Sequence, residues 1–239
     1  MLTKTEGIVF RRIPYSETSI ICDIYTSEHG LMSYIISGVR KPKARTSASL
    51  LQVMSIVDLL AYHSDSNKLH RIREIRPAYV FQTMPMDVRK NAIILFMAEL
   101  CSKCIKEHEQ NMPLYQLIHR TLVDLDEKTS GFQNHHLKFM IQLADELGFG
   151  PVASQTPEAF CFDMIDGLFT AELPSTHQYY REDEGELAQL IKYARDEGDE
   201  PQIDRQRRNG LIDDLIIYYK VHLENLKEFN SHLILREVL

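Results

Sequence analysis

The chain has 239 residues, of which 44% are hydrophobic and 26% are charged, and its formal net charge is -7. This composition suits one large or two small packed domains and argues against wholesale disorder. No apolar run reaches the roughly 18 residues of a membrane helix, the N-terminus lacks a signal-peptide pattern, and the 4 cysteines do not suggest a disulfide framework. We therefore expect a cytoplasmic protein with reduced thiols that does not enter a membrane.

Charge is distributed unevenly along the chain. Residues 1–76 carry 11 Lys and Arg against 7 Asp and Glu, a net charge of +4. Residues 77–239 carry 16 Lys and Arg against 27 Asp and Glu, a net charge of -11. A basic front and an acidic back indicate two modules with different partners, although an acidic surface also serves solubility alone.

Five stretches near the N-terminus have the alternation and β-branched content of strands. They cover residues 3–12, 18–25, 31–37, 50–62 and 69–75. The fourth is apolar enough for a helix, but its Val and Ile content and its position favour a strand. Gly30 supplies a positive φ for the turn before the third strand. Five strands in so short a module predict a small barrel: an OB-fold, which binds oligonucleotides, or an SH3-like barrel, which the strand count does not exclude.

After Pro77 the hydrophobic period becomes helical. Helices are expected over residues 86–107, 113–128, 132–147, 184–195 and from 203 or 204 to about 229. Pro113 suits a first helical turn, and Gly148 a C-cap. The irregular segment after Pro151 contains a short hairpin that turns at Asp166-Gly167. The predicted fold is α+β and multidomain: an OB-fold barrel in residues 1–80, then a helical domain in 81–239 with a hairpin insertion at about 151–180.

A cationic loop follows the third strand. It holds four cations in six residues and no acid: Arg40, Lys41, Lys43 and Arg45. Six further cations lie on or beside the strands: Arg11, Arg12, Lys68, Arg71, Arg73 and Arg76. If the barrel closes, these ten side chains can share one face. Several phosphate contacts from such a face would make DNA binding steeply dependent on salt.

Aromatic side chains in the same strands offer a second kind of contact. Stacking on unpaired bases would suit four of them: Tyr15, Tyr25, Tyr34 and Tyr62. Aromatic residues in strands mostly belong to the core, however. We therefore favour packing as the role of these tyrosines.

Cysteine and histidine pairs give no complete metal site. Cys101 and Cys104 form a C-x-x-C within a helical period, but no second pair follows to complete a zinc site. We expect both in the helix core. The adjacent His135 and His136 would point about 100° apart on a helix. They and His119 are expected to be ordinary surface or boundary residues.

Acidic residues suggest a nuclease only weakly. Two pairs could bind a metal if the fold united them: Asp145 and Glu146, and Asp213 and Asp214. Nothing in the sequence fixes that geometry, and no phosphate-binding loop, dinucleotide fingerprint or nucleophile elbow is present. We predict a protein that is not an enzyme. The run Glu182-Asp183-Glu184 fits a helix N-terminus. The amphipathic segment 211–223 fits either core packing or a groove for a partner peptide.

Four pieces at the N-terminus and two in the back half have a familiar order. They are TEGIVFRR at residues 5–12, YSETS at 15–19, HGL at 29–31, GVRKPK at 38–43, ELGFGP at 146–151, and Tyr218-Tyr219-x-x-His222-Leu223. Together they resemble the bacterial DNA repair protein RecO family. The resemblance spans nearly the whole chain and is more specific in the first half.

The resemblance implies a recombination mediator made of an OB-fold and a helical domain. Such a protein binds single- and double-stranded DNA, anneals complementary strands, and acts with RecR to load RecA onto DNA coated by single-strand-binding protein. The basic barrel residues would contact DNA at the nucleoid. The helical domain would take the C-terminal tail of the single-strand-binding protein. The alternative is a protein-interaction adaptor with a docking barrel and no direct DNA affinity.

One departure from the family concerns zinc. Many members carry a four-cysteine zinc site after the segment that ELGFGP resembles, but here that region contains only Cys161. We therefore expect no structural zinc and no other cofactor. Packing of Phe160, Phe162 and Phe169 is expected to take the place of the metal.

Overall fold

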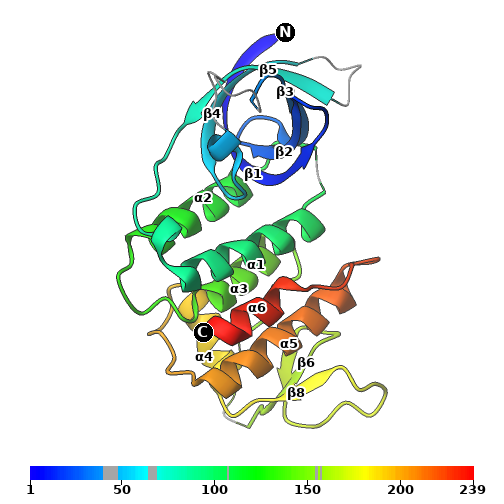
Figure 1. Ribbon diagram of the computed structural model, residues 1–239. Coiled ribbons are helices and arrows are strands. Elements are labelled where there is room, and N and C mark those ends of the chain that lie inside the picture. The colour runs from blue at the N-terminus through cyan, green and yellow to red at the C-terminus, as the bar shows by residue number, and fades with distance from the viewer. Residues whose placement is uncertain (40–47, 64–68, 107, 154–155, 157) are drawn as a thin grey trace. The chain divides into compact units, whose positions relative to one another are not determined.

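The computed structural model describes residues 1–39, 48–63, 69–106, 108–153, 156 and 158–239. The chain divides into two compact units, Met1–Glu127 and Lys128–Leu239. Within these described residues, the first unit contains a barrel, two α-helices and two short 3₁₀ helices, and the second contains four α-helices and a small sheet (Figure 1). None of the described helices is both long and apolar enough to span a membrane.

The first unit begins with a closed five-stranded barrel (Figure 1). Its strands are β1 (Leu2–Pro14), β2 (Ile20–Thr26), β3 (Gly30–Ile36), β4 (Ile56–Tyr62) and β5 (Leu69–Pro77). They pair in the order β1-β2-β3-β5-β4, and β4 closes the barrel on β1. β3 and β5 pair in parallel, and the other four pairs are antiparallel. This order with its parallel pair is the OB-fold, so the SH3-like alternative is wrong.

Alternating side chains fill the barrel. The buried cluster includes Val9, Cys22, Ile24, Tyr34 and Ile36, each of which alternates with outward-facing neighbours as the period of a strand requires.

The fourth strand is shorter than expected. It begins at Ile56, and residues Ala48–Leu51 form a short 3₁₀ helix, η1. Met54 adopts φ +65, a left-handed conformation that no strand contains. Its N–H donates to the carbonyl oxygen of Val9 at 2.6 Å, which ties this break in the strand to β1.

Two helices belong to the same compact unit, α1 (Val88–Cys104) and α2 (Met112–Glu127). The ring of Tyr25 lies 5.4 Å from that of Phe10 and 6.4 Å from that of Tyr115 on α2. The Tyr115 hydroxyl donates to Glu6 at 2.7 Å. These contacts cover part of the outer surface of β1 and β2, so that part is not available to a ligand.

The first compact unit extends beyond the point in the chain at which strands give way to helices. Strands give way to helices between Pro77 and Val88, where the sequence placed a boundary. The compact unit continues to Glu127 because α1 and α2 pack on the barrel. The division into domains at 80/81 stays a prediction.

A buried carboxylate holds the connection between β5 and α1. Asp126 accepts hydrogen bonds from the backbone N–H groups of Gln82 at 2.9 Å, Thr83 at 2.8 Å and Met84 at 2.9 Å. Lys90 is only 2% exposed, and its Nζ donates to the Asp126 carbonyl oxygen at 3.0 Å. The two side chains thus join the connection to α1 and α2.

The second unit contains α3 (His135–Glu146), β6 (Cys161–Asp163), β7 (Leu168–Thr170), β8 (Tyr180–Glu182), α4 (Glu186–Ala194), α5 (Arg205–His222) and α6 (Ser231–Val238). The predicted hairpin is confirmed, because β6 pairs with β7 around Asp166-Gly167. Strand β8 pairs with the other edge of β6, which the sequence analysis did not foresee.

The predicted last helix is shorter than expected, and the sequence analysis did not predict the helix that follows it, α6. Helix α5 ends at His222, where Leu223 is extended, and Asn225 adopts φ +57. A left-handed residue other than glycine does not continue a helix, so the chain turns before α6. Six residues of the amphipathic segment are buried: Leu211, Ile212, Leu215, Ile216, Tyr218 and Tyr219. Core packing is therefore the role of that face of α5.

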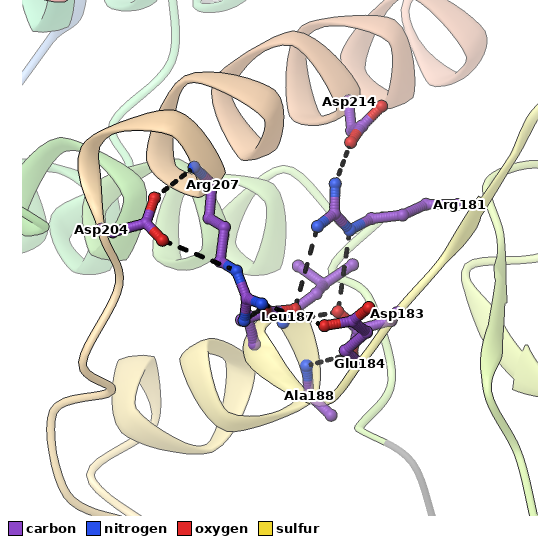
Figure 2. Close-up of polar contacts among 9 residues, drawn as sticks. Arg181, Asp183, Glu184, Leu187, Ala188, Asp204, Arg207 and Asp214 are labelled. Carbon is purple, nitrogen blue, oxygen red and sulfur yellow. Dashed lines mark hydrogen bonds and ion pairs between the residues drawn. The ribbon is translucent and has the colours of Figure 1, made fainter.

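Figure 2 shows the polar contacts that join β8, α4 and α5. Asp183 accepts from the N–H groups of Leu187 at 2.9 Å and Ala188 at 3.1 Å, and so caps α4 as the acidic run predicted. Arg181 bonds Asp214 of α5. These ion pairs fix the small sheet to the helices of its own unit.

Two expectations for the second unit are wrong in part. His135 and His136 are 8% and 0% exposed, because they lie on the core side of α3 rather than at its surface. Burial, together with the charges of Arg208 and His135, lowers the pKa of His136 to about 3. The rings of Phe162 and Phe169 contact at 5.2 Å as expected. Phe160, which directly precedes β6, is 42% exposed, so its expected burial is wrong.

Candidate nucleic-acid interface

Opposed residues of paired strands point to the same side of a sheet, which places Arg11, Asp23 and Ser33 in one outward row. The Arg11 guanidinium contacts Asp23 Oδ2 at 2.7 Å. The Ser33 hydroxyl donates to Asp23 Oδ1 at 2.7 Å. The charge of Arg11 is therefore partly neutralised by its own sheet.

Arg73 and Arg76 on β5 are paired as well. Arg73 contacts Glu74 at 3.4 Å, and Arg76 contacts Asp58 at 2.7 Å. Together with Lys4 they line a groove of about 780 Å³ over β1, β4 and β5. Cations and carboxylates alternate in this groove, so its attraction for phosphate is weaker than the count of basic residues suggests.

Arg71 differs from these three arginines. It is exposed on β5, opposite Tyr62 of β4 and Ile35 of β3. It forms no ion pair with any residue that the structure describes. Its guanidinium is therefore available to a phosphate oxygen.

The ten predicted cations divide into three groups. Arg11 and Arg12 lie at the exposed end of β1, while Arg71, Arg73 and Arg76 follow β5. Around the closed barrel, β2 and β3 separate the two strands on one side and β4 separates them on the other. Five lie outside the described residues: Arg40, Lys41, Lys43, Arg45 and Lys68. That all ten share one face stays a prediction.

The four tyrosines separate into two kinds. Tyr25 and Tyr34 are 0% exposed, which confirms core packing for them. Tyr15 is 63% exposed and Tyr62 is 47% exposed, so packing is the wrong role for these two. Tyr15 lies in the turn after β1, and Tyr62 has the outward position at the end of β4.

Three histidines meet at one end of the barrel, which the sequence analysis missed. The ring of His63 lies 4.4 Å from that of His29 and 5.0 Å from that of His70. The Tyr34 hydroxyl lies 2.8 Å from His63 Nε2. Burial, together with the neighbouring His29 and His70, lowers the pKa of His63 to about 4, so the ring is neutral near pH 7. Because these histidines are far apart in the sequence, the sequence alone did not predict that they form a cluster.

The acidic pairs of the proposed nuclease site are bound by different arginines. Asp145 contacts Arg195 at 2.6 Å, Asp213 contacts Arg236, and Asp214 contacts Arg181 (Figure 2). Within the described part of the chain, no three His, Cys, Asp or Glu side chains gather in a way that would hold a metal ion.

The C-x-x-C pair is buried, as predicted. Cys101 is 0% exposed and Cys104 is 8% exposed, both within α1. Burial raises the pKa of the Cys104 thiol to about 12. A thiol in this state is a packing group rather than a metal ligand or nucleophile.

Comparison with known proteins identifies this architecture. The family model Recombination protein O N terminal matches residues 1–81, and Recombination protein O C terminal matches residues 85–158. A protein named DNA repair protein RecO from Phocaeicola vulgatus is 30% identical over 239 residues, which is 100% of this chain and 99% of the relative. The chain belongs to the RecO family. RecO of Bacteroides fragilis is 31% identical over 240 residues, and RecO of Flavobacterium johnsoniae is 30% identical over 239 residues, each again over 100% of this chain and 99% of the relative.

The two family matches correspond to different parts of the fold. The N-terminal RecO match covers β1 to β5, and the C-terminal match covers α1 to α3. The resemblance drawn from the short N-terminal pieces is thereby confirmed over the full length of the chain. In the OB-fold, oligonucleotides bind on the face of strands 2 and 3 and at the adjoining loops. In this RecO-family barrel, that face carries Asp23, Ser33 and Ile35, and Arg11 of β1 lies beside Asp23.

Proposed function

We propose that this chain acts in DNA repair as a recombination mediator. Its barrel binds single- and double-stranded DNA and brings complementary strands together for annealing at the nucleoid. With RecR it loads RecA onto DNA coated by single-strand-binding protein, whose C-terminal tail binds the helical domain. Full-length similarity to proteins named DNA repair protein RecO supports this proposal.

The observation that carries the proposal is the charge of the OB-fold unit. Residues 1–127 contain 16 Lys and Arg against 14 Asp and Glu, whereas residues 128–239 contain 11 against 20. The barrel unit is therefore net positive in a chain of net charge -7, and it exposes Arg71 without an ion pair among the described residues. A polyanion is the partner that such a surface attracts.

A salt titration of binding to single- and double-stranded oligonucleotides tests the proposal. We expect affinity to fall steeply from low to moderate salt, because phosphate contacts release counterions. The variant with Arg40, Lys41, Lys43 and Arg45 all changed to Ala is expected to lose affinity and to show a smaller salt slope. Unchanged binding by this variant would show that the cationic loop is not part of the DNA interface.

A protein-interaction adaptor is the second candidate. It is favoured by the ion pairs that occupy Arg11, Arg73 and Arg76. This candidate predicts a stable protein complex and no affinity for plain DNA. The same titration separates the two candidates, because only the mediator is expected to bind plain DNA.

We also propose that the chain acts without catalysis and without structural zinc. The four-cysteine site of many relatives does not fit here, because the corresponding segment offers only Cys161, which is buried opposite Thr170 and Glu182 in the small sheet. Labelled DNA incubated with Mg²⁺ or Mn²⁺ should stay intact. Elemental analysis should find less than one zinc per chain, and one tightly held zinc would overturn the proposal.

A further inference from the structure

A row of side chains crosses four neighbouring strands of the barrel on its outer surface. Ile21 of β2 lies opposite Ile35 of β3, which lies opposite Arg71 of β5, which lies opposite Tyr62 of β4. The residues that alternate with them point inward and are buried: Ile20, Cys22, Tyr34, Ile36, His70, Ile72 and Ala61. Ile21, Ile35, Arg71 and Tyr62 thus form one outward strip, called here the β2–β4 strip.

The strip combines apolar surface with one cation. Tyr62 is 47% exposed, Arg71 is exposed, and Ile21 and Ile35 are half-buried. Ile13 of β1, which lies opposite Ile21, extends the apolar surface and is 42% exposed. An aromatic ring beside a guanidinium on an apolar floor is the arrangement that proteins use to hold unpaired bases.

We propose that the β2–β4 strip holds an unpaired DNA strand, with Tyr62 stacked on a base and Arg71 bound to an adjacent phosphate. The inference rests on the proposed DNA-binding function and adds to it a contact surface and a preference for single strands. A duplex hides the faces of its bases, so it can use Arg71 but not Tyr62.

Charge complementarity favours nucleic acid over a protein partner for this strip. Arg71 forms no ion pair among the described residues, and the four strip positions include no carboxylate. On one side of the strip Asp23 is bound by Arg11 and Ser33. On the other side Glu74 contacts Arg73. Adjacent strands lie about 4.8 Å apart, so Tyr62 and Arg71, which lie opposite each other on β4 and β5, are close enough to contact a base and its neighbouring phosphate.

The test compares Tyr62→Ala, Tyr62→Phe and the control Tyr179→Ala in the full chain. Tyr179 is 50% exposed but lies in the second unit. Fluorescence anisotropy is measured with a labelled oligo-dT and with a duplex of the same length, over a range of salt. Because stacking contributes about 1–3 kcal/mol per base, Tyr62→Ala should weaken oligo-dT binding by roughly five- to a hundredfold. Tyr62→Phe and Tyr179→Ala should bind as the wild type does.

Duplex binding is the internal control for folding. Tyr62→Ala should leave duplex affinity and the salt slope unchanged, because no phosphate contact is lost. If wild-type protein binds oligo-dT and Tyr62→Ala binds it equally well, the strip is not the site, although the DNA-binding function stands. An equal loss on single strand and duplex also overturns the inference. If wild-type protein binds neither, the proposed function itself fails and the strip with it.

Discussion

At the scale of single residues, two arginines on the same strand have different roles. Arg76 donates two hydrogen bonds to Asp58, at 2.7 and 3.0 Å, whereas Arg71 has no ion pair with a described residue. The sequence shows both only as cations on a predicted strand. Which carboxylate lies opposite each arginine depends on the register between β4 and β5, including a bulge at Leu60/Ala61.

Arg71→Ala is expected to weaken DNA binding more than Arg76→Ala. Each neutralised phosphate contributes about 0.7 to the salt slope for single strands, so Arg71→Ala should reduce the slope by about that amount. Arg76→Ala should leave the slope unchanged, because its guanidinium is committed to Asp58. Anisotropy titrations at several salt concentrations measure both, and a larger slope change in Arg76→Ala would contradict the assignment.

Asp126 shows a purely structural role for a buried charge. Burial opposes ionisation, but the N–H donors of Gln82, Met84 and Thr83 outweigh it and lower the pKa of the carboxyl group. Asp126→Ala would leave these donors buried without their acceptor, so we expect a loss of about 3 kcal/mol in the free energy of unfolding. The exposed Asp124→Ala should change it by less than about 0.5 kcal/mol. Urea unfolding followed by circular dichroism compares the two, and equal effects would refute this role.

At the scale of elements, short-range signals identified the β2–β3 hairpin, but contacts from distant residues decide how tightly it is held. Gly30 adopts φ +63, as the turn requires. A Cβ at this position would also lie 2.2 Å from the carbonyl oxygen of Glu109, in the connection between α1 and α2. The turn was predictable from a local glycine, and the close approach of Glu109 was not.

Gly30→Ala and Gly131→Ala separate these two effects. Both glycines have positive φ, +63 and +67, but no described atom would approach within 4 Å of a Cβ at Gly131. Gly131→Ala should cost about 1–2 kcal/mol, the penalty of left-handed backbone for alanine. Gly30→Ala should cost a further 1–3 kcal/mol from overpacking. The free energies of unfolding from urea titrations test this, and a smaller loss for Gly30→Ala would be inconsistent with the close contact.

The second unit shows which elements local sequence patterns do not predict. The helix expected to run to about residue 229 ends at His222 with α5, and α6 (Ser231–Val238) lies beyond the expected range. Asn225 in the left-handed region interrupts the expected helix, and asparagine tolerates that conformation without a glycine signal. Likewise β8 is three residues long and is defined by its pairing with β6, so no periodicity could reveal it.

At the scale of the whole molecule, each compact unit contains a histidine that folding keeps neutral. The pKa is lowered to about 4 for His63 in the first unit and to about 3 for His136 in the second. An unfolded histidine binds a proton near pH 6.5. The unfolded state therefore binds more protons between about pH 6.5 and these values, and stability falls as the pH is lowered through that window.

His136→Leu should make the protein less sensitive to acid. Between pH 7.5 and 5.0 the wild-type free energy of unfolding should fall by about 2 kcal/mol more than that of the variant, since one proton contributes about 1.4 kcal/mol per pH unit below 6.5. The exposed His108→Gln should retain the wild-type loss. Urea titrations at pH 7.5, 6.0 and 5.0 give these values, and an unchanged loss in His136→Leu would rule out His136 as the source.

The sequence by itself determined the class of most segments, the OB-like barrel with helices behind it, the buried C-x-x-C cysteines and the family. These depend on local alternation, helical period and short motifs, which involve only residues close together in the sequence. Only the tertiary structure decided which arginines are paired, which tyrosines are exposed and that three histidines meet. These properties depend on strand register and on contacts between residues far apart in the chain, and a shift of one residue in register would reverse them.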